Sequence, residues 1–186
     1  PGTIILVGGG DPTLSRTAPG QQSVYRDAPK LSTLAVGVNA KMAGTPITKI
    51  VVDGSLFTGP TWDASWKRSE QTTGYMSEVT GLQVDGDRQN PASQTSPRST
   101  TPVLNAGKYF KKALGAAAAN ATIVEGKAPG AAVEIAKVSS QPISVWIKHM
   151  LQVSDNTEAE ALARLVSLDL GYDGSFSSLN IAIKKG

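Results

Sequence analysis

The stretch TIILVGGGDPTLS, residues 3–15, decides how this chain folds. An apolar run rich in β-branched residues is stopped by Gly8–Gly10 and Asp11-Pro12, which predicts a buried strand followed by a tight turn. The glycines also suggest a phosphate-binding loop, but neither G-x-G-x-x-G nor G-x-x-x-x-G-K-[ST] is matched. We therefore interpret them as turn residues.

A helix and a second strand follow this first strand. The apolar residues Leu31, Leu34, Ala35 and Val38 have helical spacing, and Gly44 ends that pattern. The stretch ITKIVVDGSLF, residues 47–57, then predicts a strand that turns at Asp53-Gly54. A strand–helix–strand order predicts an α/β fold in which both strands share one sheet and the helix packs on a face.

The middle of the chain is less regular. We expect a strand near residues 80–84, a polar loop over 85–102, and short strands in ATIVEGKAP (121–129) and AAVEIAKVSS (131–140). Between them, PVLNAGKYFKKALGAAAANA (102–121) predicts a helix. Its expected buried side consists of Leu104, Phe110, Ala113 and Leu114.

The end of the chain is helical in pattern. Ile143, Ile147 and Leu151 lie four apart on one helical face, and a second helix runs from the corner at 154–156 to about residue 170. A third helix follows, with Phe176, Leu179 and Ile183 on one side. This change of pattern predicts a mixed α/β unit over residues 1–138 and a helical unit over 139–186 that packs separately.

Composition narrows the classes of function. The chain of 186 residues has no Cys, which excludes disulfides and Cys-ligated metals, and its one His, His149, excludes multi-His metal sites. Its 18 basic and 15 acidic residues are scattered, so we expect no nucleic-acid binding. No apolar run approaches the roughly 20 residues of a membrane span. We expect no cofactor and no metal.

The corner Ser154-Asp155-Asn156, within KHMLQVSDNTEAEALARL (148–165), allows two interpretations. All three residue types are good helix N-caps, and Thr157 with Glu160 has capping-box spacing. Alternatively, a hydroxyl here could relay a proton and a carboxamide could hold a substrate amide through its donor and its acceptor. Periodicity alone favours the cap.

A local Ser-His-Asp triad would need Ser154, Asp155 and His149. His149 lies about 200° round the helix from Ile147, so we expect it to be exposed and away from the apolar stripe. No G-x-S-x-G elbow is present. Four further acidic residues lie at predicted turns, where Asp is common, and receive no acid/base or metal role: Asp11, Asp53, Asp85 and Asp87.

Four motifs give the chain a resemblance to a known family. LVGGGDPTL (6–14), IVVDGSLF (50–57), SEVTGLQVDGDR (77–88) and KHMLQVSDNTEAEALAR (148–164) occur in the order seen in D-alanyl-D-alanine carboxypeptidases of the low-molecular-mass class C penicillin-binding proteins. The chain resembles actinobacterial, including mycobacterial, members over nearly its whole length. The resemblance implies inserted mixed α/β domains over 1–138. The helical part of a penicillin-binding (β-lactamase/transpeptidase-like) catalytic domain would follow over 139–186.

The resemblance also implies roles for the corner. The family carries Ser-x-x-Lys, Ser-x-Asn and Lys-Thr-Gly elements, of which only the second occurs here, so the chain resembles a middle fragment of the enzyme. Ser154 would pass a proton to the leaving D-Ala amine, and Asn156 would hydrogen-bond the acyl-side amide of the substrate. Asp155 would fix the backbone of the corner.

The implied activity is that of a serine-type D-Ala-D-Ala carboxypeptidase or endopeptidase. It would cleave peptidoglycan stem peptides ending in D-Ala-D-Ala through an acyl-enzyme, outside the cytoplasm, and β-lactams would inhibit it. The remaining parts of the same polypeptide would be partners, and this chain alone would be inactive. The alternative is a non-catalytic module that binds or organises the cell wall. For the enzyme, we expect Ser154 and Asn156 to be accessible at a helix–helix junction.

Overall fold

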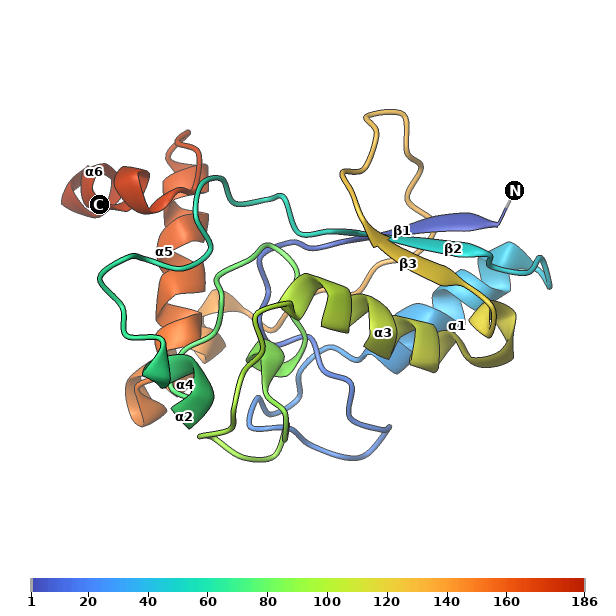
Figure 1. Ribbon diagram of the computed structural model, residues 1–186, viewed down its shortest axis with the longest axis horizontal. Coiled ribbons are helices and arrows are strands. Elements are labelled where there is room, and N and C mark those ends of the chain that lie inside the picture. The colour runs from blue at the N-terminus through green and yellow to red at the C-terminus, as the bar shows by residue number, and fades with distance from the viewer. Residues whose placement is uncertain (1, 186) are drawn as a thin grey trace.

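The computed structural model describes residues 2–185 as a mixed α/β structure (Figure 1). The strands β1 (Thr3–Val7), β2 (Lys49–Asp53) and β3 (Thr122–Glu125) form one parallel sheet in the order β1-β2-β3. Ile4 lies opposite Ile50 in the first pair. The predicted α/β class and the pairing of the first two strands are confirmed.

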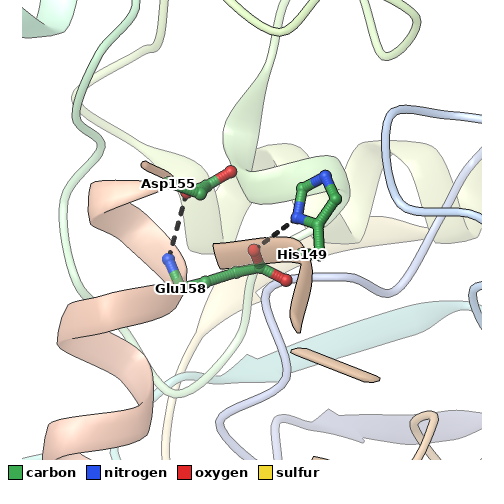
Figure 2. Close-up of side chains that lie close together, drawn as sticks. All are labelled: His149, Asp155 and Glu158. Carbon is green, nitrogen blue, oxygen red and sulfur yellow. Dashed lines mark hydrogen bonds and ion pairs between the residues drawn. The ribbon is translucent and has the colours of Figure 1, made fainter. Parts of the chain in front are cut away.

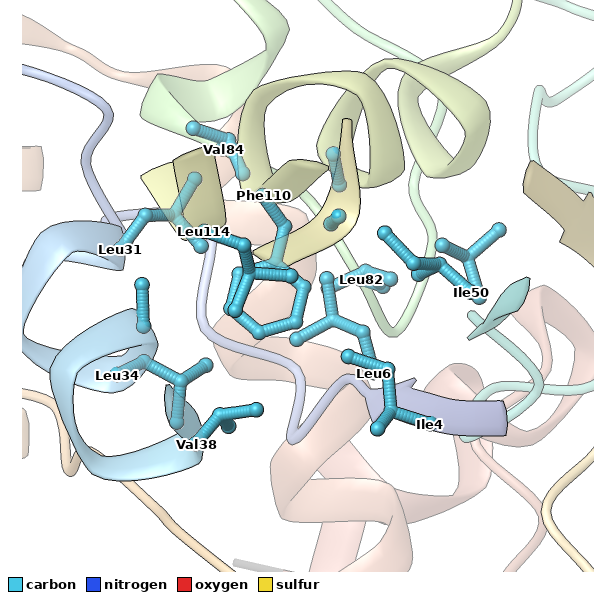
Figure 3. Close-up of a cluster of buried hydrophobic side chains, with 14 of the residues drawn as sticks. Ile4, Leu6, Leu31, Leu34, Val38, Ile50, Leu82, Val84, Phe110 and Leu114 are labelled. Atoms are coloured by element: carbon cyan, nitrogen blue, oxygen red, sulfur yellow. The ribbon is translucent and has the colours of Figure 1, made fainter. Parts of the chain in front are cut away.

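Helices α1 (Leu31–Met42) and α3 (Pro102–Leu114) lie together on one face of this sheet (Figure 1). In Figure 3, side chains of α1 and α3 meet those of β1 and β2 in a shared apolar core. The predicted buried side of α1 is confirmed. On α3, Phe110 and Leu114 are buried as expected, whereas Leu104 and Ala113 are only half-buried.

The remaining helical segments are α2 (Ser69–Thr73), the short 3-10 helices η1 (Asp85–Asp87) and η2 (Gly115–Ala118), α4 (Ile143–Val153), α5 (Asn156–Asp169) and α6 (Phe176–Lys185). Of these, η2 still contributes Ala118 to this core. A second apolar cluster joins Phe57, Trp62, Met76 and Val79 to Leu165, Leu168 and Phe176. The C-terminal helices therefore rest on the 57–79 segment. The division into domains at residue 138 stays a prediction. Among residues 2–185, no helix is long and apolar enough to cross a membrane.

Two predicted strands are wrong. Residues 80–84 cross the carboxyl ends of β1 and β2, and the bonds Gly10 N–H to Gly81 O (2.8 Å) and Gly81 N–H to Gly54 O (3.1 Å) replace a ladder. Residues 131–140 run in irregular conformation beside α1, where Ala136 packs against Gly37. A groove separates that segment from the edge of β1, so no ladder forms.

The apolar stripes of the C-terminal helices are more exposed than expected. Trp146 is the buried anchor of α4, whereas the stripe residues Ile147 and Leu151 are 42% and 71% exposed. On α6, Leu179 is buried as predicted, but Ile183 is 63% exposed. Helical periodicity identified which residues share a face, but not which face is covered.

The segment of residues 80–84 passes over the end of β1 with its backbone in close contact with Gly8. A Cβ on Gly8 would lie 2.2 Å from the carbonyl oxygen of Gly81 and 2.5 Å from the Cα of Leu82. Both are backbone atoms and cannot rotate away. Gly9, the next residue, has open space around its Cβ position.

We predict that Gly8→Ala destabilises the chain and Gly9→Ala does not. The clash at residue 8 should lower the free energy of unfolding by about 1–3 kcal/mol or more, as overpacking does. Gly9→Ala should change it by no more than about 1 kcal/mol, in the stabilising direction if the alanine restricts the unfolded chain. Urea unfolding of both variants tests this, and equal midpoints would refute the close crossing.

Candidate functional site: the Ser-Asp-Asn corner

The corner joins α4 to α5, at a helix–helix junction as expected. Helix α4 ends at Val153 and α5 begins at Asn156. Ser154 has the left-handed backbone conformation, with φ 55° and ψ 49°, and the backbone N–H groups of Ser154 and Asp155 donate to the Met150 carbonyl. This tight C-cap turns the chain within two residues.

Asp155 points inward and caps α5. Its Oδ1 accepts hydrogen bonds from the backbone N–H groups of Thr157 (3.0 Å) and Glu158 (3.1 Å). The predicted Thr157–Glu160 capping box is therefore wrong. Thr157 instead is buried, with its hydroxyl 3.4 Å from that of Ser77, because α5 begins at Asn156, two residues earlier than a Thr157 cap requires.

The second oxygen of Asp155 forms a buried ion pair. Oδ2 accepts from Arg88 Nη2 (2.6 Å), the Tyr25 hydroxyl (3.2 Å) and Gln94 Nε2 (3.2 Å). Burial alone would raise the pKa of Asp155, but the charge and hydrogen bond of Arg88 outweigh it and hold that pKa below 3.8. The ion pair therefore contributes its full share to the free energy of unfolding above pH 3.8. This contribution is lost as the pH falls through the lowered pKa of Asp155.

Ser154 and Asn156 point outward on either side of this anchor. Both are exposed, as predicted. Asn156 Nδ2 donates to the Tyr75 carbonyl at 3.3 Å, which leaves its carboxamide oxygen free of partners within residues 2–185. The Ser154 hydroxyl has no hydrogen-bond partner in the same described range. The corner thus presents one hydroxyl and one carboxamide to solvent.

His149 is not the exposed residue that the sequence predicted. Its Nδ1 lies 2.5 Å from Oε2 of the buried Glu158, and its side chain is 22% exposed (Figure 2). The hydrogen bond to Glu158 raises the pKa of His149 above 6.5. The ring nitrogen that faces the interior is therefore committed to Glu158, and a Ser-His-Asp triad does not form.

His149, Asp155 and Glu158 could in principle hold a metal ion. Their ligand atoms lie within 4.8 Å of one another (Figure 2). Each is already committed, however: His149 and Glu158 bind each other, and Asp155 binds the guanidinium of Arg88. A buried cation beside the group disfavours a second one. We interpret the group as an ion-pair network.

Arg88 and Tyr25 support the corner from the other half of the chain, and neither was predicted from the sequence. Arg88 is 1% exposed and Tyr25 is 3% exposed. The sequence offered one indication, the DGDR stretch at residues 85–88, which predicts a turn but does not show which residue Arg88 contacts. An arginine is rarely buried without an acidic partner, but a sequence alone does not say which acid it meets.

We predict that Asp155→Ala costs roughly 3–5 kcal/mol of stability. The substitution leaves the buried Arg88 charge unpaired and removes the N-cap of α5. Asp169→Ala, in the same helix and exposed, is the matched control and should change stability by no more than about 0.5 kcal/mol. Thermal or urea unfolding measures both, and a small cost at residue 155 would show that the pair does not anchor the corner.

The His149–Glu158 pair should make stability depend on pH. Its contribution is fully present below the ordinary His pKa of 6.5 and is lost as the pH rises through the raised value. His149→Gln should therefore lower the free energy of unfolding near pH 6 and lower it less near pH 8.5, because the charged His149 that pairs with Glu158 is less populated at the higher pH. Urea midpoints at both pH values test this. Lys148→Gln, exposed on the same helix, should show no such difference.

The sequence of the chain is similar to that of a known protein family. The model of the D-Ala-D-Ala carboxypeptidase 3 (S13) family matches residues 1–95 and 87–185. Carboxypeptidase Rv3627c of Mycobacterium tuberculosis and carboxypeptidase DacB of Mycolicibacterium smegmatis are each 36% identical over 176 residues, 95% of this chain. The chain spans 37% and 38% of the length of these relatives. It belongs to the D-Ala-D-Ala carboxypeptidase 3 (S13) family.

Proposed function

We propose that this chain is the part of a serine-type D-Ala-D-Ala carboxypeptidase that carries the Ser-x-Asn element of the active site. The observation that carries the proposal is the corner itself: Ser154 and Asn156 face solvent while Asp155 is buried between them. Family membership supports it, as do the two mycobacterial relatives that are named carboxypeptidases. The carboxypeptidase is the proposed activity of the longer protein to which the chain would contribute.

The chemistry is acyl transfer from a stem peptide ending in D-Ala-D-Ala. A serine outside this chain attacks the carbonyl carbon of the penultimate D-Ala, the peptide C–N bond breaks, and the leaving D-Ala amine takes up a proton. Ser154 relays that proton, for which an accessible hydroxyl without other partners is suited. Water then hydrolyses the ester, and the free serine is restored.

Asn156 would orient the substrate. A carboxamide can donate to a carbonyl and accept from an N–H at the same time, which matches the acyl-side amide of a peptide. In this structure its nitrogen donates a hydrogen bond to the Tyr75 carbonyl, while its oxygen accepts none from the described residues. Holding the scissile bond in register in this way lowers the barrier by orientation.

The same proposal covers location and inhibition. Peptidoglycan lies outside the cytoplasm, so we place the protein in an extracytoplasmic compartment. A β-lactam presents a strained amide to the same nucleophile and would acylate it. Endopeptidase cleavage of cross-linked peptides would use the same corner, because it breaks the same kind of peptide bond.

We expect Ser154→Ala and Asn156→Ala, made in the full-length protein, to slow acylation by a β-lactam about 10²–10³-fold without unfolding it. This is the usual cost of removing one group that acts in the transition state. Ser144→Ala and Asn180→Ala, both exposed on neighbouring helices, are the matched controls and should react at the normal rate. Time-resolved intact-mass spectrometry measures each rate.

Treatment of the isolated 186-residue chain with a β-lactam tests whether the nucleophile lies outside this chain. The chain contains no Ser-x-x-Lys, so it should acquire no covalent β-lactam adduct. A stoichiometric adduct on the isolated chain would show that the nucleophile lies within it. Normal acylation of both full-length variants would instead show that the corner is only a helix cap, and the absence of any adduct on the full-length protein would favour a non-catalytic, cell-wall-binding module.

A further inference from the structure

The turn DGDR, residues 85–88, has an unusual buried backbone. Asp85, Gly86 and Asp87 all have positive φ, at 53°, 56° and 57°, and all three are buried. Glycine adopts this conformation freely, whereas an aspartate does so at a steric cost. Such residues persist where their surroundings hold them, and they cluster at functional sites. None of the steps in the proposed reaction involves this turn.

Neighbouring side chains hold the turn in place. Arg16 Nη1 binds Asp85 Oδ2 at 3.0 Å, and Arg98 donates to the Gly86 carbonyl. Arg98 Nη2 also donates to the carbonyl of Gly74, at 3.1 Å, one residue before the Tyr75 carbonyl that receives Asn156. The turn is therefore braced against the segment that supports the corner.

Arg88 leaves this turn directly toward the corner. Its guanidinium donates through Nη2 to Asp155 Oδ2 and through Nη1 to the Tyr25 hydroxyl, each at 2.6 Å. Its Nε donates to the Gln94 carbonyl at 3.3 Å. Nη1 also donates to the Asp85 carbonyl at 3.2 Å, and these four bonds on a buried side chain leave Arg88, and Asp155 with it, little freedom to move.

We propose that Arg88 is a positioning residue for the Ser-Asp-Asn corner. It holds Asp155 inward, and the backbone on either side then directs Ser154 and Asn156 outward. The inference rests on the proposed function, since it names what sets the geometry of that same site. Ser154 has a left-handed backbone and directly precedes Asp155 in the chain, so a shift of Asp155 would change the direction of the Ser154 side chain.

A lysine at residue 88 would keep the charge but lose the geometry. A guanidinium is a planar fork that binds two partners in fixed directions, whereas an ammonium is a point charge on a flexible stem. Arg88→Lys should therefore leave Asp155 paired but less well placed. A displacement of about 1 Å in a positioned group can cost on the order of a hundredfold in rate.

The test compares two buried arginines in the full-length protein. Arg164, on α5 away from the corner, is 0% exposed and donates to the carbonyls of Pro60 (2.9 Å) and Gly174 (3.2 Å). Arg88→Lys and Arg164→Lys should both lower the melting temperature. At a temperature where both remain folded, Arg88→Lys should slow β-lactam acylation and peptide kcat about ten- to hundredfold, with KM changed far less. Arg164→Lys should react at the normal rate.

Tyr25→Phe provides a milder second variant if Arg88→Lys does not fold. It removes the hydroxyl that bridges Arg88 and Asp155 but leaves both charges, and it should slow acylation by a smaller factor. In the 186-residue chain, the backbone amide NMR shifts of Thr157 and Glu158 report on the cap. They should move in Arg88→Lys and Tyr25→Phe and stay in place in Arg164→Lys.

The outcomes separate this inference from the function on which it rests. Normal acylation of full-length Ser154→Ala and Asn156→Ala overturns the proposed function, and this inference falls with it. If those variants are slow but Arg88→Lys and Tyr25→Phe are normal, the positioning role alone is overturned. Equal slowing by Arg88→Lys and Arg164→Lys also overturns it, because a general loosening of the fold would then be the cause.

Discussion

The buried ion pair between Arg88 and Asp155 ties the Ser-Asp-Asn corner to the turn at residues 85–88. Taking either charge out of water alone would be costly, so the two segments that carry them must meet. Arg88 reaches the pair from a turn that begins where the chain has crossed the ends of β1 and β2 at Gly81. Together with the apolar cluster that contains Phe57 and Phe176, this contact joins the N-terminal part of the chain to its helical end.

The two interpretations of Ser-Asp-Asn are compatible, because they concern different residues. Asp155 is the helix cap, with one oxygen on the first turn of α5 and the other on Arg88. The side chains of Ser154 and Asn156 take no part in this N-cap and face solvent. A cap and a site can thus occupy three consecutive positions, because one inward side chain leaves its two neighbours pointing outward.

Local patterns predicted much of the fold, whereas the contacts around the corner could not be predicted from them. The first two strands, their pairing and the buried side of α1 follow from periodicity. Residues 80–84 look like a strand but cross the sheet, because Gly81 packs on Gly8, which lies far away in the sequence. Likewise, a helical wheel places His149 on a face but cannot show that Glu158 of the next helix covers it. The exposure of Ser154 and Asn156 was predicted, whereas their support by Arg88 was not.

The left-handed backbone of Ser154 lowers the stability of the fold at the same residue whose hydroxyl we propose to act in catalysis. Any residue with a Cβ adopts that conformation at a cost of roughly 1–2 kcal/mol, and glycine adopts it freely. The most stable sequence for this corner therefore carries no hydroxyl at all. Random substitution followed by screening for heat resistance would favour glycine at residue 154. The proton relay that we propose for the Ser154 hydroxyl would account for a serine at this position despite that backbone cost.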